Sequence, residues 1–167
     1  MLTVARLQEV LRYNPKTGIF VWRINKFRHN GGGNAHKGAR AGTINNGYRR
    51  IKIDGVIYRA GRLAVLWMTG SFPPCDVDHI NLDRSDDRWT NLRQATRSLN
   101  KANSKTQNRK FVPLKGVSWD KQKQKYCAYI RVNGRTINLG RFARAKDAHA
   151  AYGIAARKHF GQFARSD

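Results

Sequence analysis

Acidic residues are scarce in this chain of 167 residues, which has 10 Asp and Glu against 33 Lys and Arg and a formal net charge of +23. Such an excess of positive charge is typical of proteins that bind nucleic acid, and DNA is the partner that we expect. The basic residues are spread along the whole chain, so several surfaces are expected to contact phosphates. A ribosomal protein would show a similar charge.

Cysteine and long apolar runs are also scarce. Cys75 and Cys127 each lack a Cys-x-x-Cys partner, which argues against a zinc site or a disulfide framework and favours a reducing compartment. No apolar run approaches the roughly 20 residues of a membrane-spanning helix, and the amino terminus lacks the apolar core of a signal peptide. We therefore expect a cytoplasmic protein without a membrane partner, built from one domain or two small ones.

Hydrophobic periodicity and turn residues predict the elements of the first half of the chain. They are a helix at 3–13, a strand at 18–22, a hairpin of strands at 47–53 and 56–59, and a buried helix at 62–69. Asp54-Gly55 supplies the tight turn of the hairpin. Gly70 and the pair Pro73-Pro74 end the buried helix.

Half of the few acidic residues gather in one window. They are Asp76, Asp78, Asp83, Asp86 and Asp87. Asp78 precedes His79 in a short apolar strand, which places a hard oxygen ligand beside a general base. The later three aspartates are expected in a solvated loop. The cluster fits a cation site, which a ribosomal protein would not need.

His79, Asn91 and Asn100 resemble the His-Asn-Asn form of the HNH endonuclease motif, found in phage and intron-encoded nucleases. The resemblance implies a ββα-metal (His-Me finger) fold, with one strand at Asp78 and His79, a polar loop, a second strand at 91–94 and a helix at 96–104. It also implies a DNA endonuclease of phage-encoded or homing type, acting in the cytoplasm of a bacterial host cell.

The resemblance implies a role for each matched residue. Asp78 and Asn100 would bind one divalent ion. His79 would take a proton from the attacking water, and Asn91 would orient the loop and the histidine. Carboxylate and amide oxygens favour Mg²⁺, with Mn²⁺ also possible. Asn103 lies on the same helix face as Asn100 and is the competing candidate for the second ligand.

Two further positions bear on the resemblance. Phage relatives often carry His-Arg-Leu before the buried helix, whereas this chain has Gly61-Arg62-Leu63, so an auxiliary phosphate contact is expected to be missing. Arg93 is a candidate phosphate clamp, and packing beside Trp89 is the alternative interpretation.

The last third of the chain predicts three strands, with a hairpin turn at Asn133-Gly134, and a helix at about 144–159. It resembles the AP2 domain, known from plant transcription factors and also found on phage HNH nucleases, through Gly116-Val117, Tyr129-Ile130-Arg131, Leu139-Gly140-Arg141-Phe142 and Phe160-Gly161. The resemblance implies a three-stranded antiparallel sheet packed on one helix, with the sheet lying in the major groove of DNA.

Alternation along the strands predicts which side chains face DNA. If Ala128 and Ile130 face the helix, the opposite face carries the candidate base readers Lys125, Tyr129, Arg131 and Asn138, with Arg131 the best of them. Loop and rim positions rarely reach base edges, so they are candidate phosphate contacts. These are Lys121, Lys123, Arg135 and Arg141.

The sequence thus predicts an α+β protein with a lead-in helix and strand at 1–46, a nuclease domain at 47–104, a linker at 105–114 and an AP2-like domain at 115–163. Double-stranded DNA is the expected partner, bound by a monomer or a dimer. Two other function classes stay open: a non-catalytic DNA-binding regulator and a general RNA-binding protein.

Overall fold

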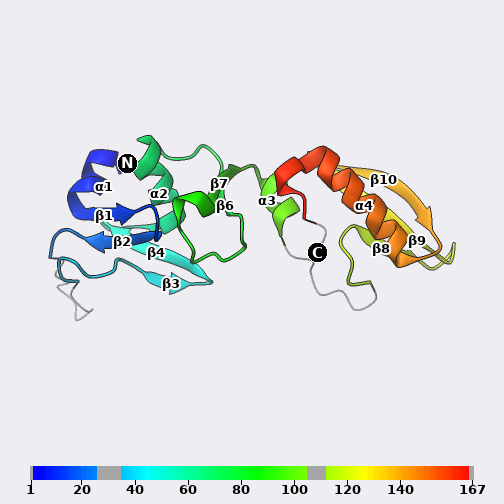
Figure 1. The fold of residues 1–167 in the computed structure, drawn as a ribbon, viewed down its shortest axis with the longest axis horizontal. Coiled ribbons are helices and arrows are strands. Elements are labelled where there is room, and N and C mark those ends of the chain that lie inside the picture. The colour runs from blue at the N-terminus through cyan, green and yellow to red at the C-terminus, as the bar shows by residue number, and fades with distance from the viewer. Residues whose placement is uncertain (1, 26–34, 105–111, 166–167) are drawn as a thin grey trace. The chain divides into compact units, whose positions relative to one another are not determined.

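A computed structural model describes residues 2–25, 35–104 and 112–165 (Figure 1). The chain divides into two compact units, Met1–Gln94 and Ala95–Asp167, and both contain helices and small sheets, as expected for an α+β protein. The boundary between the two units lies within the predicted nuclease domain 47–104, so the helix that carries Asn100 belongs to the second unit. Among the described helices, none has both the length and the apolar character that crossing a bilayer requires.

The described residues of the first unit form two short α-helices and three small sheets. Its elements in chain order are α1 (Val4–Val10), β1 (Leu11–Asn14), β2 (Ile19–Trp22), β3 (Thr43–Asn45), β4 (Tyr48–Ile53), β5 (Val56–Arg59), α2 (Ala60–Thr69), β6 (Asp76–His79), the 3-10 turn η1 (Trp89–Asn91) and β7 (Leu92–Ala95), whose last residue lies past the division. Strand β1 pairs antiparallel with β2, and β4 lies between β3 and β5. The pair β6 and β7 forms the sheet that carries the polar motif.

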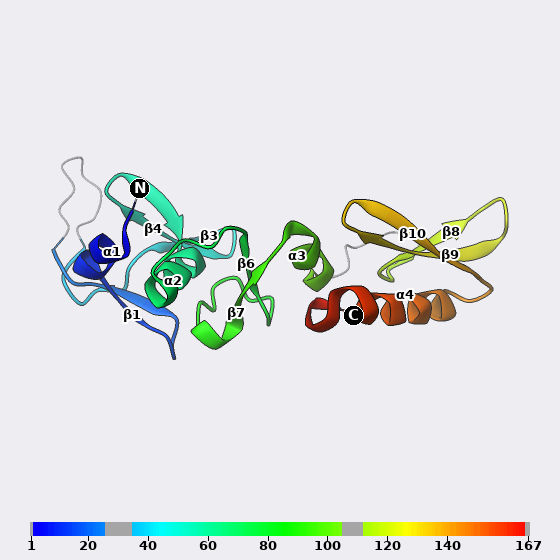
Figure 2. The same ribbon diagram turned by 90° about the horizontal axis from the view of Figure 1, so that it is seen from above.

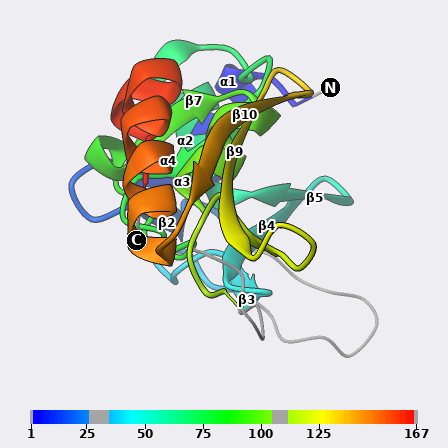
Figure 3. The same cartoon turned by 90° about the vertical axis from the view of Figure 1, so that its right-hand side faces the viewer.

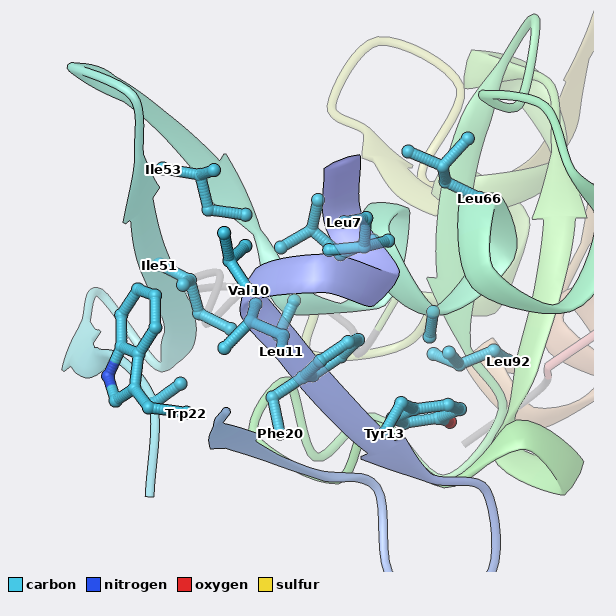
Figure 4. Close-up of a cluster of buried hydrophobic side chains, with 14 residues drawn as sticks. Leu7, Val10, Leu11, Tyr13, Phe20, Trp22, Ile51, Ile53, Leu66 and Leu92 are labelled. Carbon is cyan, nitrogen blue, oxygen red and sulfur yellow. The ribbon is translucent and has the colours of Figure 1, made fainter. Parts of the chain in front are cut away.

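The core of the first unit joins the amino-terminal segment to the buried helix. Leu7, Leu11 and Phe20 are fully buried in one cluster with Ile51 and Leu63 (Figure 4). The described residues of 1–46, expected as a lead-in, therefore share one core with the segment that follows them.

The predicted helix at 3–13 is wrong in its last three residues. Thr3 caps α1 by accepting a hydrogen bond from the Arg6 backbone N–H at 3.2 Å, but the helix ends at Val10. Leu11 and Tyr13 then alternate with exposed residues in β1 and pair with β2, because the antiparallel partner satisfies the backbone that a longer helix would have used. A strand of four residues is too short for its own periodicity to outweigh the preceding helical pattern.

In its described residues, the second unit contains a three-stranded sheet, a long helix packed on the sheet and a short helix packed on that long helix. Its elements are α3 (Arg97–Asn103), β8 (Val117–Asp120), β9 (Lys125–Val132), β10 (Arg135–Phe142), α4 (Ala145–Phe160) and the 3-10 turn η2 (Gly161–Phe163). Strand β9 is central and antiparallel to both neighbours. Helix α4 lies along one face of this sheet, as Figures 2 and 3 show from two directions. The three strands and the covering helix agree with the sequence prediction.

Helix α3 belongs to the core of the second unit. Ala102 is buried in one cluster with Tyr152 and Phe160 of α4. The ammonium group of Lys115 donates hydrogen bonds to the backbone carbonyls of Ala102 and Ser104, which satisfies acceptors that the end of α3 leaves open. The predicted linker 105–114 lies mostly outside the described residues, and its end packs in this unit, where Val112 is buried.

Candidate nuclease site

Asp78 and His79 lie at the end of β6 and are both buried, with exposed fractions of 4% and 6%. Neighbouring residues of a strand point to opposite faces, but the strand ends at His79, where the Leu82 backbone N–H donates to the His79 carbonyl in a turn. Buried polar side chains at a strand end need partners, because an unpaired polar group in the interior destabilises the fold. Both residues have such partners.

The partner of His79 is Asp87. His79 Nε2 lies 3.1 Å from Asp87 Oδ1, and Asp87 is only 2% exposed. The prediction that Asp87 lies in a solvated loop is therefore wrong, although Asp83 is exposed as expected. Asp87 Oδ2 is also buried and accepts no hydrogen bond within the described part of the chain. No periodicity in the sequence signals a contact of this kind.

Residues distant in the sequence hold Asp87 in the interior. The Tyr13 hydroxyl donates to the Asp87 backbone carbonyl at 2.7 Å, and burial raises the pKa of this tyrosine. Arg49 is half-buried and donates to the Gly42 carbonyl at 2.9 Å. Burial lowers the pKa of Arg49 and Arg40 lowers it further, while the negative charge of Asp87 acts in the opposite direction. The Asp87 carboxylate thus lies within the electrostatic reach of a buried cation.

Gly61 makes room for the same carboxylate. A Cβ atom at position 61 would lie 3.2 Å from Asp87 Oδ1 and 3.5 Å from side-chain atoms of Leu92 and Val77. A histidine there would meet the Asp87 carboxylate. The glycine that the sequence marks as a missing phosphate contact is therefore matched to a buried aspartate.

The side chain of Asn91 holds the polar loop in place. Its Oδ1 accepts from the Asn81 backbone N–H at 3.0 Å, and its Nδ2 donates to Asn81 Oδ1 at 2.9 Å and to the Asp86 carbonyl at 2.8 Å. The Ile80 N–H also donates to the Asn91 backbone carbonyl. These bonds fasten both ends of the loop between His79 and Asp87, which is the geometry that an orienting residue needs.

Replacing Asn91 tests this fastening. Asn91→Ala would remove three partly buried side-chain hydrogen bonds and leave their partners on Asn81 and Asp86 unpaired, so we expect a loss of about 2–4 kcal/mol in the free energy of unfolding. For a unit of this size that is a fall in Tm of roughly 10–20 °C, measured by calorimetry. Asn45→Ala, at an exposed position of β3, is the control and should leave Tm within about 2 °C. Equal Tm values for both variants would contradict an anchoring role.

The remaining aspartates of the loop stabilise its outer turn. Asp86 binds Arg88, with Oδ2 and Nη2 2.6 Å apart, and this bond lowers the pKa of Asp86. Asp83 accepts from both the hydroxyl and the backbone N–H of Ser85, which lowers its pKa as well. Both carboxylates therefore have protein partners, and they serve the loop itself.

Arg93 holds Asp78. Its Nε lies 2.9 Å from Asp78 Oδ2, and the two side chains are 11% and 5% exposed. The sequence suggested either a phosphate clamp or packing beside Trp89, and the ion pair with Asp78 was not foreseen. The contact joins β7 to β6 and fixes the orientation of the carboxylate.

The two candidates for the second ligand lie on α3 of the second unit. Asn100 is half-buried and Asn103 is 5% exposed, whereas Asp78 belongs to the first unit. Within the described residues, no group of three or more His, Cys, Asp or Glu side chains is placed to hold a metal ion. The donor set of one carboxylate and one amide is nevertheless chemically suited to Mg²⁺, which retains several waters and needs few protein ligands.

The predicted DNA-contacting residues all lie in the second unit except Arg93. On β9, Ala128 and Ile130 are buried, Lys125 and Arg131 are exposed and Tyr129 is half-buried, as alternation predicts. Tyr129 pairs with Asn138 across the sheet. The Asn138 side chain accepts from the Gly140 N–H at 2.9 Å beside an irregularity of the strand pairing, so part of its hydrogen-bonding capacity serves the backbone.

The four phosphate candidates are exposed: Lys121, Lys123, Arg135 and Arg141. Arg141 pairs in register with Cys127, which places it on the same face as Tyr129 and Arg131, whereas it was expected at a rim. Its Nε also lies 3.5 Å from Asp120 Oδ2. This sheet face therefore presents two arginines and a tyrosine to solvent.

Residues 58–102 match the family model of the HNH endonucleases. The matched segment contains Asp78, His79, Asn91 and Asn100, and it ends just before Asn103. The match supports a nuclease, a phosphodiester hydrolase that acts on DNA, at the level of the family. No curated protein matches the chain significantly.

Proposed function

We propose that the chain is a metal-dependent DNA endonuclease of the HNH type, which hydrolyses a phosphodiester bond of double-stranded DNA. The observation that carries the proposal is the buried pair of His79 and Asp87 beside Asp78, inside the segment that matches the HNH endonucleases. An imidazole held by a carboxylate is suited to general-base chemistry. The net charge of +23 supports a polyanionic substrate.

His79 is the proposed general base. Because an ionised Asp87 can only accept hydrogen bonds, Nε2 of His79 carries the proton between them and Nδ1 carries the lone pair. Nδ1 then takes a proton from water as the water oxygen bonds to phosphorus and the bond to the 3′ oxygen breaks. Asn91 contributes by holding the loop that brings Asp87 to the imidazole.

Asp78 and Asn100 are the proposed ligands of a divalent ion, with Asn103 as the alternative second ligand. Their oxygen donors favour Mg²⁺ or Mn²⁺ over softer ions. The bond from Arg93 to Asp78 suits this role, because carboxylates that bind metals usually hold a second hydrogen bond. A bound divalent ion would supply Lewis-acid stabilisation of the charge on the phosphate and the leaving oxygen.

The second unit is the proposed selector of the cleavage site. As an AP2-like domain it would lay the face of β8, β9 and β10 opposite α4 in the major groove, with Arg131 as the main base reader. Lys125, Tyr129 and Asn138 would assist in reading bases, and Lys121, Lys123, Arg135 and Arg141 would contact phosphates. The exposure of these basic side chains supports the assignment. An enzyme of phage-encoded or homing type, acting in the cytoplasm of a bacterial host, fits this combination.

Removing the metal tests the proposed reaction. Wild-type protein with phage-sized duplex DNA and Mg²⁺ should produce new ends, chelator should reduce cutting to the rate of DNA alone, and added Mn²⁺ should restore it. Mapping the ends gives the position of the cut and the strand. Tight binding of DNA without cutting in either metal would favour a regulator, and a preference for structured RNA over duplex DNA would favour an RNA-binding protein.

A further inference from the structure

Two arginines from different segments converge on one tyrosine ring beside His79. The guanidinium carbon of Arg59, at the end of β5, lies 4.4 Å from the centre of the Tyr48 ring, and that of Arg84 lies 5.0 Å from it. Tyr48 begins β4 and is half-buried, while both arginines are exposed. Cations over an aromatic face are attracted by its quadrupole, so the ring holds both guanidiniums in place.

The aliphatic part of the Arg84 side chain is held in place as well as its guanidinium group. A Cβ atom built on Gly47 would lie 3.5 Å from Arg84 Cδ and 3.6 Å from its Cβ, so the aliphatic stem runs over the backbone of Gly47. The arginine therefore extends from the polar loop of the site across the start of β4. A long side chain anchored in this way loses less conformational freedom when its head binds a ligand.

These two cations have no carboxylate partner among the described residues. Arg6, Arg88 and Arg93 each lie within 3.0 Å of an Asp or Glu oxygen, but Arg59 and Arg84 form no ion pair in the described part of the chain. Two like charges held near one ring repel each other, and a bound anion beside them would relieve the repulsion. Guanidinium groups bind phosphate oxygens with paired N–H donors.

The cluster lies next to the proposed general base. The centre of the Tyr48 ring is 6.0 Å from the centre of the His79 ring. Each DNA strand carries one phosphate for about every 3.4 Å of helix axis, so the cluster lies within reach of a phosphate next to the one that is cut.

We propose that Arg59, Arg84 and Tyr48 form a phosphate clamp, which binds a backbone phosphate of the DNA strand beside the scissile phosphate. The inference rests on the proposed nuclease function, because it takes His79 as the position of the cut. Tyr48 acts as a positioning residue that holds the two guanidiniums. The clamp contacts no base, so it contributes affinity and register on the strand without sequence preference.

The salt dependence of DNA binding tests the clamp directly. Binding is measured in chelator with His79→Ala as the background, so that no cleavage occurs, and log Kd is plotted against log salt concentration. Each phosphate that is no longer neutralised lowers the slope by about 0.9, so Arg59→Gln with Arg84→Gln, which together release one phosphate, should lower it by about 0.9. Arg6→Gln is the matched control, since Arg6 is already paired with Glu9 and Asp54. The slope of this variant should equal the slope of the background protein.

The ring is tested with two further variants. Tyr48→Phe keeps an aromatic face and should retain most of the slope of the background protein. Tyr48→Leu no longer holds the guanidiniums, so its slope should fall at least halfway from that of the background to that of the double arginine variant. Once the cut has been mapped, a duplex with a neutral methylphosphonate at the neighbouring phosphate should weaken binding of the background protein. The same duplex should weaken binding of the double arginine variant no further.

The outcomes separate the clamp from the nuclease. An unchanged slope in the double arginine variant, with wild-type protein cutting DNA, would overturn the clamp alone. A reduced slope in a protein whose wild type cuts no DNA would support phosphate binding by the two arginines and overturn the nuclease. A methylphosphonate penalty that persists in the double variant would place that phosphate on other residues and also overturn the clamp.

Discussion

His79→Ala should cut DNA about 10²–10⁴-fold more slowly than wild type while binding the same duplex with nearly unchanged affinity, since this is the usual contribution of a general base. The reason is local. His79 lies beside Asp78 and is hydrogen-bonded to Asp87. It is not one of the proposed phosphate contacts, so its loss should change the rate and not the affinity. Single-turnover cleavage with saturating protein measures the rate, and a binding titration in chelator measures the affinity.

Two further variants show whether slower cutting by His79→Ala comes from the loss of the base or from a loss of folding. His79→Ala leaves the buried Asp87 carboxylate without its partner, which destabilises the unit. His79→Gln retains an N–H donor for Asp87 but cannot take up a proton at neutral pH, so it should be as slow as His79→Ala with a higher Tm. His159→Ala, at an exposed position of α4, should cut at the wild-type rate. Cutting by His79→Gln at the wild-type rate would exclude His79 as the base.

Asp87→Asn should lower kcat by about 10–100-fold with KM and Tm little changed, because groups that orient an active histidine contribute on this scale. The amide has the shape of the carboxylate, but it can donate as well as accept. Some molecules would then hold His79 in the tautomer with the proton on Nδ1, which cannot accept the proton of water. Steady-state kinetics of the two proteins in parallel measure kcat and KM separately.

A spectroscopic signature distinguishes this role from simple packing. In wild type, the ¹⁵N shifts of a histidine-labelled sample should place the His79 proton on Nε2, as the bond to Asp87 requires. In Asp87→Asn that population should fall, while His149, which is bonded to the Lys115 carbonyl, stays unchanged. If Asp87→Asn kept both the tautomer and kcat, Asp87 would be a packing residue and nothing more.

The order of the motif along the chain could be predicted from the sequence, and its partners in space could not. Asp78, His79 and Asn91 follow each other at a recognisable spacing, and the strand and loop around them form where hydrophobic pattern and turn residues indicate. Asp87 has the local sequence of a solvated turn. It is buried because Tyr13, 74 residues away, and Gly61 of α2 enclose it, and local patterns carry no record of such contacts.

The same limit applies to the arginines. The contacts of Arg59 and Arg84 to one tyrosine ring could not be predicted, since such contacts have no sequence period. Arg93 in the second strand suggested a phosphate contact or packing beside Trp89, and neither interpretation included its ion pair with Asp78. In the last third of the chain the prediction went further, because alternation in a sheet covered on one face determines which side chains are exposed.

Gly18 places the amino-terminal segment against the backbone of the polar loop in residues 58–102, a segment that begins forty residues after it. Its φ angle is +73°, and a Cβ atom there would lie 2.4 Å from the Arg88 backbone nitrogen and 2.5 Å from the Asp87 carbonyl carbon. The Trp89 N–H also donates to the Pro15 carbonyl at 2.9 Å. Residues 58–102 therefore depend for their conformation on contacts with residues 15 and 18, and they are not expected to keep it when moved into another protein. In a chimaera or over evolutionary time, a side chain at position 18 would disturb the polar loop as surely as a substitution inside the motif, because the atoms that it would meet belong to the backbone of residues 87 and 88.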